Sequence, residues 1–256
     1  MLKNYGKFLP AVLISCYLNP VFSFDYNDYI PNFHYPFVAS FSAGPAWQSP
    51  GKTQTLDLTP AVTRTYAADK DTSFLATSNL FLGMQYSLSE NLQSQIGLDL
   101  ALTGNNRVSG DVWEDANPVF NNFDYFYEIN HRHIALKAKL LPNIQLPAFN
   151  RQLKPWVSAT AGVGFNTAHD FMNTPKIFAA IASPNFSDHT TTSFTYALGF
   201  GAQYQLNKNW QIGLGYEFSD WGKSKLGSMS GISTIQKPAL SKLYSHAILL
   251  NFTFLA

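Results

Sequence analysis

The sequence has few charged residues, a net charge near zero, one cysteine and no long apolar run, and these shortages argue against several classes of protein. Charged residues make up 13% of the 256 residues, about half of the roughly 25% that is usual in soluble domains. The longest apolar run covers residues 8–14, far fewer than the roughly 18 residues that a transmembrane helix requires. The net charge of +1 gives no electrostatic basis for binding nucleic acid. The composition therefore argues against a helical membrane protein and against a nucleic-acid-binding protein.

The first two dozen residues have the pattern of an export signal. Lys3 and Lys7 precede a short apolar stretch at residues 8–16, and Ser23 ends a segment typical of a cleavage site. Residues 1–23 are therefore predicted to be a cleaved signal peptide.

The cysteine leaves a second kind of processing open. Residues 13–16 resemble the site at which bacterial lipoproteins are acylated, and Cys16 stands at the position of the modified cysteine. If cleavage instead follows Ser23, the mature chain has no thiol, which excludes both a disulfide framework and cysteine chemistry.

The rest of the chain alternates apolar residues with small or polar ones at a period of two, which predicts β-strands rather than helices. The alternation is clearest from Trp210 to Ser219, where five large apolar side chains share one face. Eight strands are predicted, at residues 37–47, 74–88, 92–103, 129–141, 156–165, 194–206, 210–219 and 244–254.

The connections between these strands alternate in length. Short turns are expected at residues 89–91 and 207–209, with a longer third member at 142–155. Long polar loops are expected at residues 48–73, 104–128, 166–191 and 220–241. Short periplasmic turns and long external loops are typical of outer-membrane barrels. The fold is therefore predicted to be all-β, an eight-stranded antiparallel up-and-down transmembrane β-barrel at residues 37–256, preceded by a periplasmic arm at residues 24–36.

The less apolar face of the strands indicates which side meets lipid. It carries glycine, alanine, serine, threonine and glutamine rather than the lysine and glutamate of a water-facing sheet. Small inward residues suit a narrow curved barrel, so the apolar face is predicted to contact lipid. Aromatic residues near the strand ends then form interfacial girdles, with Trp47, Tyr86, Tyr204, Trp210, Phe218, Tyr244, Phe252 and Phe254 as the predicted members.

Several segments resemble known outer-membrane strands. Residues 209–218, residues 154–165 and the closing residues 252–254 resemble strands of the OmpA/OmpX-like, opacity-type outer-membrane β-barrel superfamily. The loop segments 111–116 and 218–224 resemble those of an uncharacterised gammaproteobacterial branch.

The resemblance covers roughly residues 35–256. It implies location in the bacterial outer membrane, with outer-membrane lipid, lipopolysaccharide and the barrel assembly machinery as partners. Leu255 and Ala256 follow the final aromatic residue where such families usually end on one, and Leu249 stands where a glycine is common. These departures concern recognition by the assembly machinery.

Four charged residues fall on the inward face, namely Asp99, Lys137, Lys139 and Glu217. Eight strands enclose only enough space for side chains, and buried charges need partners. We therefore expect an interior polar network that neutralises itself and fills the lumen. A polar lining of a small channel is the alternative.

Histidines offer a possible metal site. His131 and His133 are two residues apart on one predicted strand, so both point into the upper lumen, and such a pair can bind a transition metal. A third ligand is not evident, because His169 and His189 are expected in loops. Titrating, hydrogen-bonded histidines are therefore expected instead, with no metal and no cofactor.

An embedded lipid-modifying enzyme is a further alternative, with Ser245 and His246 as candidates. These neighbours point to opposite faces of a strand, which prevents direct contact between nucleophile and base. No catalytic residue is therefore predicted.

The external loops are rich in aromatic residues, and the second loop holds Trp113, Phe120, Phe123, Tyr125, Phe126 and Tyr127. Exposed aromatics mark a binding face for an extracellular ligand, whereas buried ones would mean that the loops pack on each other. The favoured function is a surface structural or interaction protein of adhesin-like type. A small porin-like channel is the first alternative, and the lipid-modifying enzyme is the second.

Overall fold

The computed structural model describes residues 36–143, 153–181, 185–229, 231 and 234–256. The predicted signal peptide and all but the last residue of the predicted arm lie outside this part of the chain. Within it, the chain is almost entirely β-structure, with one short 3₁₀ helix. None of the described helices is long and apolar enough to span a membrane.

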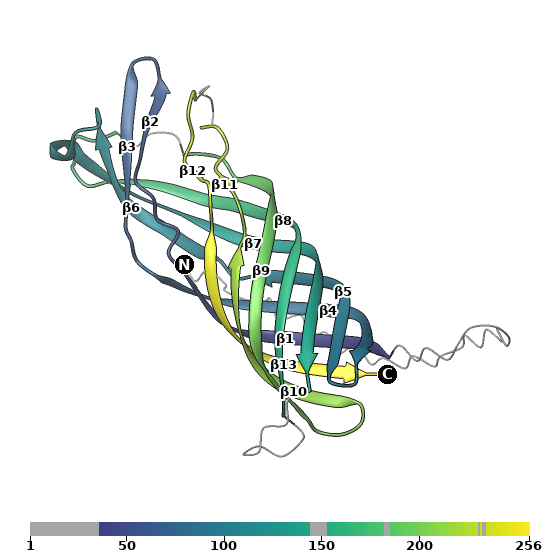
Figure 1. Ribbon diagram of the computed structural model, residues 1–256. Helices are drawn as coiled ribbons and strands as arrows, with labels where there is room; N and C mark the ends of the chain where they lie inside the picture. Colours follow the sequence, from purple (N-terminus) through teal and green to yellow (C-terminus); the bar gives the residue numbers. More distant parts are fainter. Residues whose placement is uncertain (1–35, 144–152, 182–184, 230, 232–233) are drawn as a thin grey trace, which may run out of the picture. The chain divides into compact units, whose positions relative to one another are not determined.

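Eight antiparallel strands close into a ring, which confirms the predicted barrel (Figure 1). In spatial order they are β1 (Phe37–Gln48), β4 (Ser73–Ser89), β5 (Leu92–Thr103), β7 (Asn121–Pro142), β8 (Leu153–Pro175), β9 (His189–Gln205), β10 (Trp210–Asp220) and β13 (Tyr244–Leu255). Ring neighbours follow one another along the chain, as in an up-and-down barrel. The ring closes where β13 pairs with β1, in a register that sets Val38 opposite Leu255.

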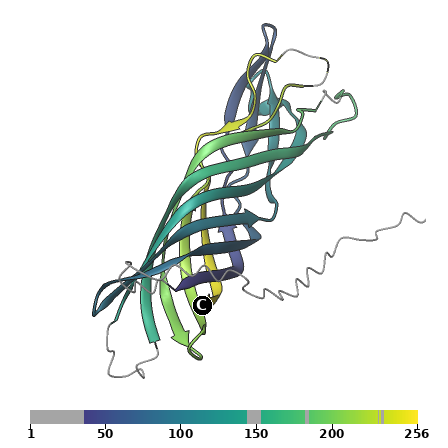
Figure 2. The same ribbon diagram turned by 90° about the vertical axis from the view of Figure 1, so that its right-hand side faces the viewer.

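Three further strands lie beyond the ring, at the end with the long connections (Figures 1 and 2). They are β2 (Gln54–Thr59), β3 (Val62–Ala68) and β6 (Asn106–Glu114), and the 3₁₀ helix η1 (Pro118–Phe120) follows β6. The sheet order β2-β3-β6-β7 attaches them to the first half of β7, and the second half of β8 pairs with that same half. We call this five-stranded region the external extension.

The extension corrects the expected polar loops at residues 48–73 and 104–128. Both segments are largely β-sheet, and β7 begins at Asn121 rather than at residue 129. The segment 166–191 is also shorter as a loop than expected, because β8 continues to Pro175 and β9 begins at His189. In the last long connection, β11 (Ser224–Lys225) and β12 (Ala239–Leu240) form a small ladder.

A β-bulge interrupts the pairing of β7 with β8 at the base of the extension. Phe126 pairs with Met172 and Glu128 with His169, so Tyr127 alone faces two residues of β8, Asp170 and Phe171. Asp170 takes a φ of 55°, a left-handed conformation that aspartate tolerates better than most residues. The bulge reverses which residues of β8 face outward above this point.

The largest apolar core lies in the extension and not in the barrel. Its buried members come from β2, β3, β6, β7 and β8 and from the last two long connections, and include Leu58, Tyr66, Val112, Phe123, Tyr125, Tyr127, Ile129, Phe171, Phe186, Trp221, Leu226, Met229 and Leu243. Removal of the phenol from water raises the pKa of Tyr66 to about 12. The extension is thus built like a small soluble β-protein on top of the barrel.

Candidate functional site

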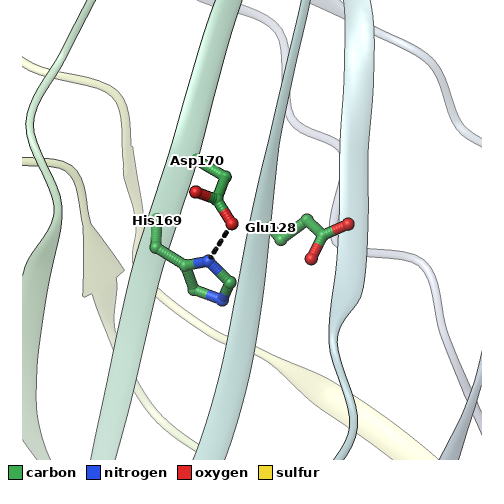
Figure 3. Close-up of side chains that lie close together, drawn as sticks. All are labelled: Glu128, His169 and Asp170. Carbon is green, nitrogen blue, oxygen red and sulfur yellow. Dashed lines mark hydrogen bonds and ion pairs between the residues drawn. The ribbon is translucent and has the colours of Figure 1, made fainter. Parts of the chain in front are cut away.

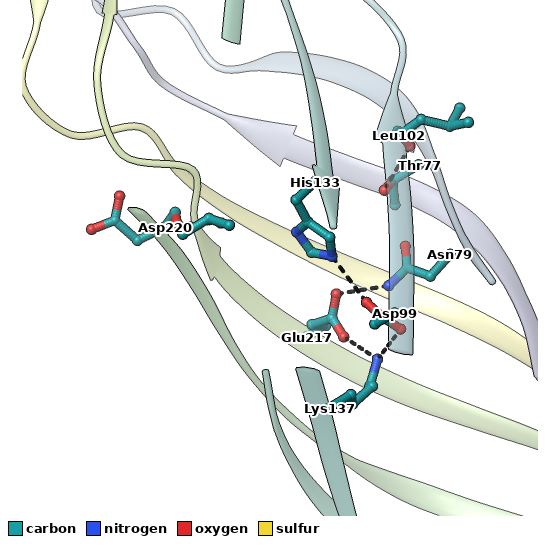
Figure 4. A network of polar contacts seen from close by, with 9 residues as sticks. Thr77, Asn79, Asp99, Leu102, His133, Lys137, Glu217 and Asp220 are labelled. Atoms are coloured by element: carbon teal, nitrogen blue, oxygen red, sulfur yellow. Dashed lines mark hydrogen bonds and ion pairs between the residues drawn. The ribbon is translucent and has the colours of Figure 1, made fainter. Parts of the chain in front are cut away.

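Three of the four predicted inward charges meet in the middle of the lumen (Figure 4). Lys137 Nζ donates hydrogen bonds to Asp99 Oδ1 at 3.3 Å and to Glu217 Oε2 at 3.1 Å. Asn79 Nδ2 donates to the other Glu217 oxygen at 3.1 Å, and His133 Nε2 lies 2.9 Å from Asp99 Oδ2. One ammonium group therefore bridges two carboxylates that reach it from β5 and β10.

Lys139 lies in the same lumen but outside this ion network. Its Nζ donates to Gln203 Oε1 at 2.6 Å and lies 4.6 Å from the ring centroid of Trp156. The indole fits against the wall because Gly215 has no side chain, since a Cβ there would come within 2.4 Å of it. The structure thus brings Lys137 together with the two acids, and gives Lys139 an amide and an aromatic ring instead.

Side chains fill the space between these two groups. A small cavity of about 20 Å³ lies among residues of β1, β4, β5, β7, β8, β10 and β13, with Ser42, Lys137, Lys139, Trp156 and Glu217 in its wall. A volume of this size is enough for about one water molecule.

His131 and His133, the pair for which hydrogen bonds rather than a metal were expected, lie on the extension side of the ion network. His131 Nδ1 is 2.8 Å from Asn166 Oδ1 and its Nε2 is 3.1 Å from Gln48 Oε1. Both histidine rings pack against Trp221, each with its centroid 5.1 Å from that of the indole. Every ring nitrogen that makes a bond is directed at an amide or at Asp99, so the pair is arranged as a hydrogen-bonded layer below an aromatic residue.

Trp221 also explains the position of Ser245. The indole Nε1 donates to Ser245 Oγ at 2.7 Å on the inner face. His246, on the outer face, lies 2.5 Å through its Nδ1 from Tyr216 Oη and stacks against Trp47 at 5.9 Å. The two candidate catalytic residues therefore point to opposite faces and have separate partners.

One cluster within the described residues has the composition of a cation site, on the outer surface at the bulge (Figure 3). Glu128, His169 and Asp170 offer ligand atoms within 4.8 Å of one another. His169 Nδ1 lies 2.8 Å from Asp170 Oδ2, and Asn130 Nδ2 donates to His169 Nε2 at 3.1 Å. The expectation that His169 lies in a loop is wrong, because it lies within β8; His189 is the first residue of β9. His169 approaches Glu128 and Asp170, not the pair in the lumen.

An ion bridge stabilises the outer face of the extension. Asp111 and Asp124 are directly opposite on β6 and β7, a like-charge pair that repels by itself. Lys176 Nζ reaches both carboxylates, at 2.5 Å and 2.9 Å. The hydrogen bond from Lys176 lowers the pKa of the Asp111 carboxyl below its ordinary value, and the same bond raises the pKa of Lys176.

The aromatic residues predicted for the girdles fall at the two ends of the barrel. Near the extension, Phe218 packs on Tyr244 at 5.6 Å, and Trp47 pairs with His246 in the same region. Near the chain termini, Trp210 packs on Phe254 at 5.1 Å, and Ile212 pairs with both Tyr204 and Phe252. Tyr86 lies near the same end, among the last residues of β4.

The aromatics of the second long connection divide between the two faces of the extension. Phe123, Tyr125 and Tyr127 are buried in the apolar core, so they are not an exposed binding face. Phe126 lies on the outer face with Arg107, whose guanidinium carbon is 3.9 Å from the ring centroid.

One family model matches this chain, and several solved structures are similar to it. The family model of the outer membrane protein β-barrel domain matches residues 36–250, whereas no curated protein matches the sequence. Similar solved structures include OprG from Pseudomonas aeruginosa, with 14% identity, a TM-score of 0.48 and coverage of 86% of this chain and 97% of that one. Neisserial surface protein A has 11% identity and a TM-score of 0.43, and covers 86% of this chain and 96% of its own.

The protease OmpT from Escherichia coli has 7% identity and a TM-score of 0.46, and covers 86% of this chain and 97% of its own. At these identities the likenesses concern the fold alone. The family match covers well over half of the chain and confirms both the predicted resemblance and the outer-membrane location. The chain belongs to the outer membrane protein β-barrel domain family.

Proposed function

We propose that this protein is a non-conducting outer-membrane barrel that presents the external extension as an interaction surface at the cell surface. The observation that carries the first half is the pair of ion pairs that Lys137 makes across the lumen. Lys137 joins Asp99 to Glu217 across the barrel, and the space left beside them is about 20 Å³. A hydrated ion needs a continuous water-filled path, and a cavity for about one water does not provide it.

The apolar core above the lumen supports the same proposal. Trp221 covers the His131 and His133 rings, and buried side chains from β2, β6, β7 and the last connection lie around it. A conducting path would have to pass both this core and the ion network. No catalytic step is part of the proposal, because Ser245 is bound to Trp221 and His246 lies on the other face.

The second half of the proposal uses the distal end of the extension. Val119 and Phe120 precede β7, and Ile177 and Phe178 follow β8, whose Pro175 is paired with Phe123. All four are large exposed apolar residues, and Phe178 is fully exposed. Exposed apolar groups gathered at one end favour a protein partner.

Planar-bilayer recording tests the closed lumen. Purified full-length protein should give no resolved single-channel steps, while a variant in which Trp221, Lys137 and Glu217 are replaced by alanine should conduct if the lumen network is the block. Regular, ion-selective steps from the wild type would overturn the proposal in favour of the porin-like alternative.

Cell binding tests the interaction surface. Cells that display the wild-type protein should bind extracellular-matrix proteins or host cells more strongly than cells displaying Phe120→Ser with Phe178→Ser. The matched control is Leu88→Ser, which alters an exposed apolar residue at the end of β4 that lies away from the extension. Equal binding by all three strains would contradict an interaction role for this end of the molecule.

A further inference from the structure

The cluster of Glu128, His169 and Asp170 lies at the β-bulge, on the outer face of the external extension (Figure 3). In a regular strand His169 and Asp170 would point to opposite faces, because consecutive side chains alternate. The bulge breaks this alternation, so Phe171 is buried in the apolar core while Asp170 is exposed on the side of His169. Two consecutive polar side chains of β8 are thereby brought beside Glu128, the residue of β7 that pairs with His169.

The hydrogen bonds of His169 orient its ring as in a metal-binding histidine. Nδ1 lies 2.8 Å from Asp170 Oδ2, and Nε2 accepts a hydrogen bond from Asn130 Nδ2 at 3.1 Å. The ring proton is therefore on Nδ1, where the carboxylate accepts it, and Nε2 carries a lone pair. A carboxylate on one ring nitrogen fixes the imidazole and makes the other nitrogen a better metal ligand.

The Asn130 amide is the member of this group whose hydrogen bonds are incomplete. Asn130 is two residues from Glu128 on the outward face of β7. Its Oδ1 is closed to solvent and has no hydrogen-bond partner within the described residues, although buried polar atoms nearly always have one. Half a turn of the amide exchanges its oxygen with its nitrogen. The oxygen then faces His169 Nε2, and a cation between the two atoms would be bound by both.

The charges around the cluster also favour a cation. Within the part of the chain that the structure describes, neither Glu128 nor Asp170 forms an ion pair with a lysine or an arginine. Asp188 Oδ1 accepts a hydrogen bond from the backbone N–H of Asp170 at 3.1 Å, which adds a third carboxylate. Arg107 pairs with Glu128 across β6 and β7, but its guanidinium lies over the Phe126 ring. Neighbouring carboxylates repel one another, and a divalent cation removes that repulsion.

We propose that this cluster binds a divalent transition-metal ion, for which zinc is the best match, through His169 Nε2, the Glu128 carboxylate and the Asn130 amide oxygen. Asp170 orients the imidazole from its other side. Zinc accepts nitrogen and oxygen ligands in sets of three or four, whereas calcium takes six to eight oxygen ligands. The ion joins β7 to β8 at the base of the extension. The site is separate from the lumen and from the distal tip, so the proposed function does not depend on it.

Calorimetric titration of the folded full-length chain with zinc chloride, after treatment with a chelator, tests this site. His169→Gln and Glu128→Gln should each weaken zinc binding tenfold or more, because loss even of a group that only orients a ligand costs about 10–100-fold in metal affinity. Asp170→Asn should weaken it by about tenfold for that reason. The matched control is His189→Gln, since His189 pairs with the buried Ala168 and so lies on the other face of the sheet. Heat-modifiable mobility on gels shows that each variant is folded.

The variants and a second cation separate a built site from a surface that attracts cations in general. Zinc binding that His169→Gln and Glu128→Gln weaken, and that His189→Gln leaves within about twofold of the wild type, supports the proposal. Equal zinc affinity in all of these proteins, or no zinc binding by the wild type, would overturn it. Calcium bound as tightly as zinc, with no effect of His169→Gln, would also overturn it, because the carboxylates alone would then account for the binding.

Discussion

The barrel and the external extension share strands, but the apolar residues of those strands face outward in the barrel and inward in the extension. Along β7, the inward residues Lys139, Lys137 and His133 are polar, while the outward residues Leu136 and Ile134 are exposed and apolar. On the N-terminal side of residue 130, in the external extension, the inward face becomes apolar and the outward face polar. Ile129, Tyr127 and Tyr125 are buried in an apolar core, and Glu128 and Asp124 lie outside.

The reversal shows how the surroundings decide the meaning of an alternating strand. In lipid the apolar face must point outward, and the interior is left for polar side chains that satisfy one another. In water the apolar face must point inward. The change occurs at Arg132, an outward-facing charge between Ile134 and Asn130, which is the position expected for the boundary of the hydrocarbon region.

The largest effect is expected from breaking the ion network of the barrel. Lys137→Met leaves the Asp99 and Glu217 carboxylates buried without their cation, and removal of one member of a buried ion pair costs about 3–5 kcal/mol. Urea unfolding in lipid bilayers should show this loss. Adding Asp99→Asn and Glu217→Gln should recover most of it, because no unpaired charge is then buried. If Lys137→Met unfolded at the wild-type midpoint, the network would not contribute to stability.

Lys139 provides the matched contrast, on the same strand and the same inward face. It has Gln203 and Trp156 as partners and no carboxylate. Lys139→Met therefore removes a buried charge that has no counter-ion, and the free energy of unfolding should be equal to or higher than that of the wild type. A loss as large as that of Lys137→Met would mean that Lys139 neutralises Glu217 after all.

The extension should respond as a soluble core does. Phe171→Ala removes a ring that packs edge-on against Phe186 at 5.1 Å, and such truncations cost about 3–5 kcal/mol. The loss should be local, because the ring of eight strands does not depend on this core. Limited proteolysis should then cut the extension of the variant, while the barrel keeps its heat-modifiable mobility on gels. Phe126→Ala, on the outer face, is the control and should not increase cleavage.

Charge on the outward face separates the two regions again. Leu136→Arg places a cation in lipid and should cost about 2–4 kcal/mol. Thr174→Arg, on the outward face of the extension, meets water and should change stability by no more than about 0.5 kcal/mol. Unfolding of both variants in the same bilayers gives the comparison. Similar costs for both would place the lipid boundary beyond the bulge at Asp170, and not at Arg132.

The same reversal explains what the sequence could predict. The eight ring strands follow from alternation, and β5 has the predicted bounds, because lipid-facing residues such as Leu98 and Leu100 contrast with a small inward face. Residues 123, 125, 127 and 129 alternate just as regularly, but Asp124 and Glu128 between them face water. Read as part of a lipid-facing pattern, that stretch resembles a polar loop. The signal of the longer β7 is therefore a strand whose apolar face changes from outward to inward along its length.

The candidate site shows a second limit. Alternation predicts that Asp99, Lys137, Lys139 and Glu217 share the inward face, but it does not predict their heights along the barrel. The stagger of the strands sets Glu217 beside Lys137, not beside Lys139. The polar residues around Trp221, such as Asn166 and Gln48, were missed because amides on an inward face carry no signal of their own.

The smallest effect concerns the water-facing ion bridge of the extension. Lys176→Gln leaves Asp111 and Asp124 facing each other without a cation, and exposed pairs of this kind contribute about 0–1 kcal/mol. Stability is therefore a poor readout, and titration of the Asp111 carboxyl by NMR is a sharper one. In the wild type its pKa lies below the ordinary value of 3.8, so its contribution is present at neutral pH and is lost as the pH falls through the folded pKa. In Lys176→Gln the pKa should rise, since the repelling Asp124 remains. Salt should reduce the difference between the two proteins, because both groups face water. If the Asp111 pKa did not change, the carboxylates would not be coupled through Lys176, and the outer face would owe its structure to β-sheet pairing alone.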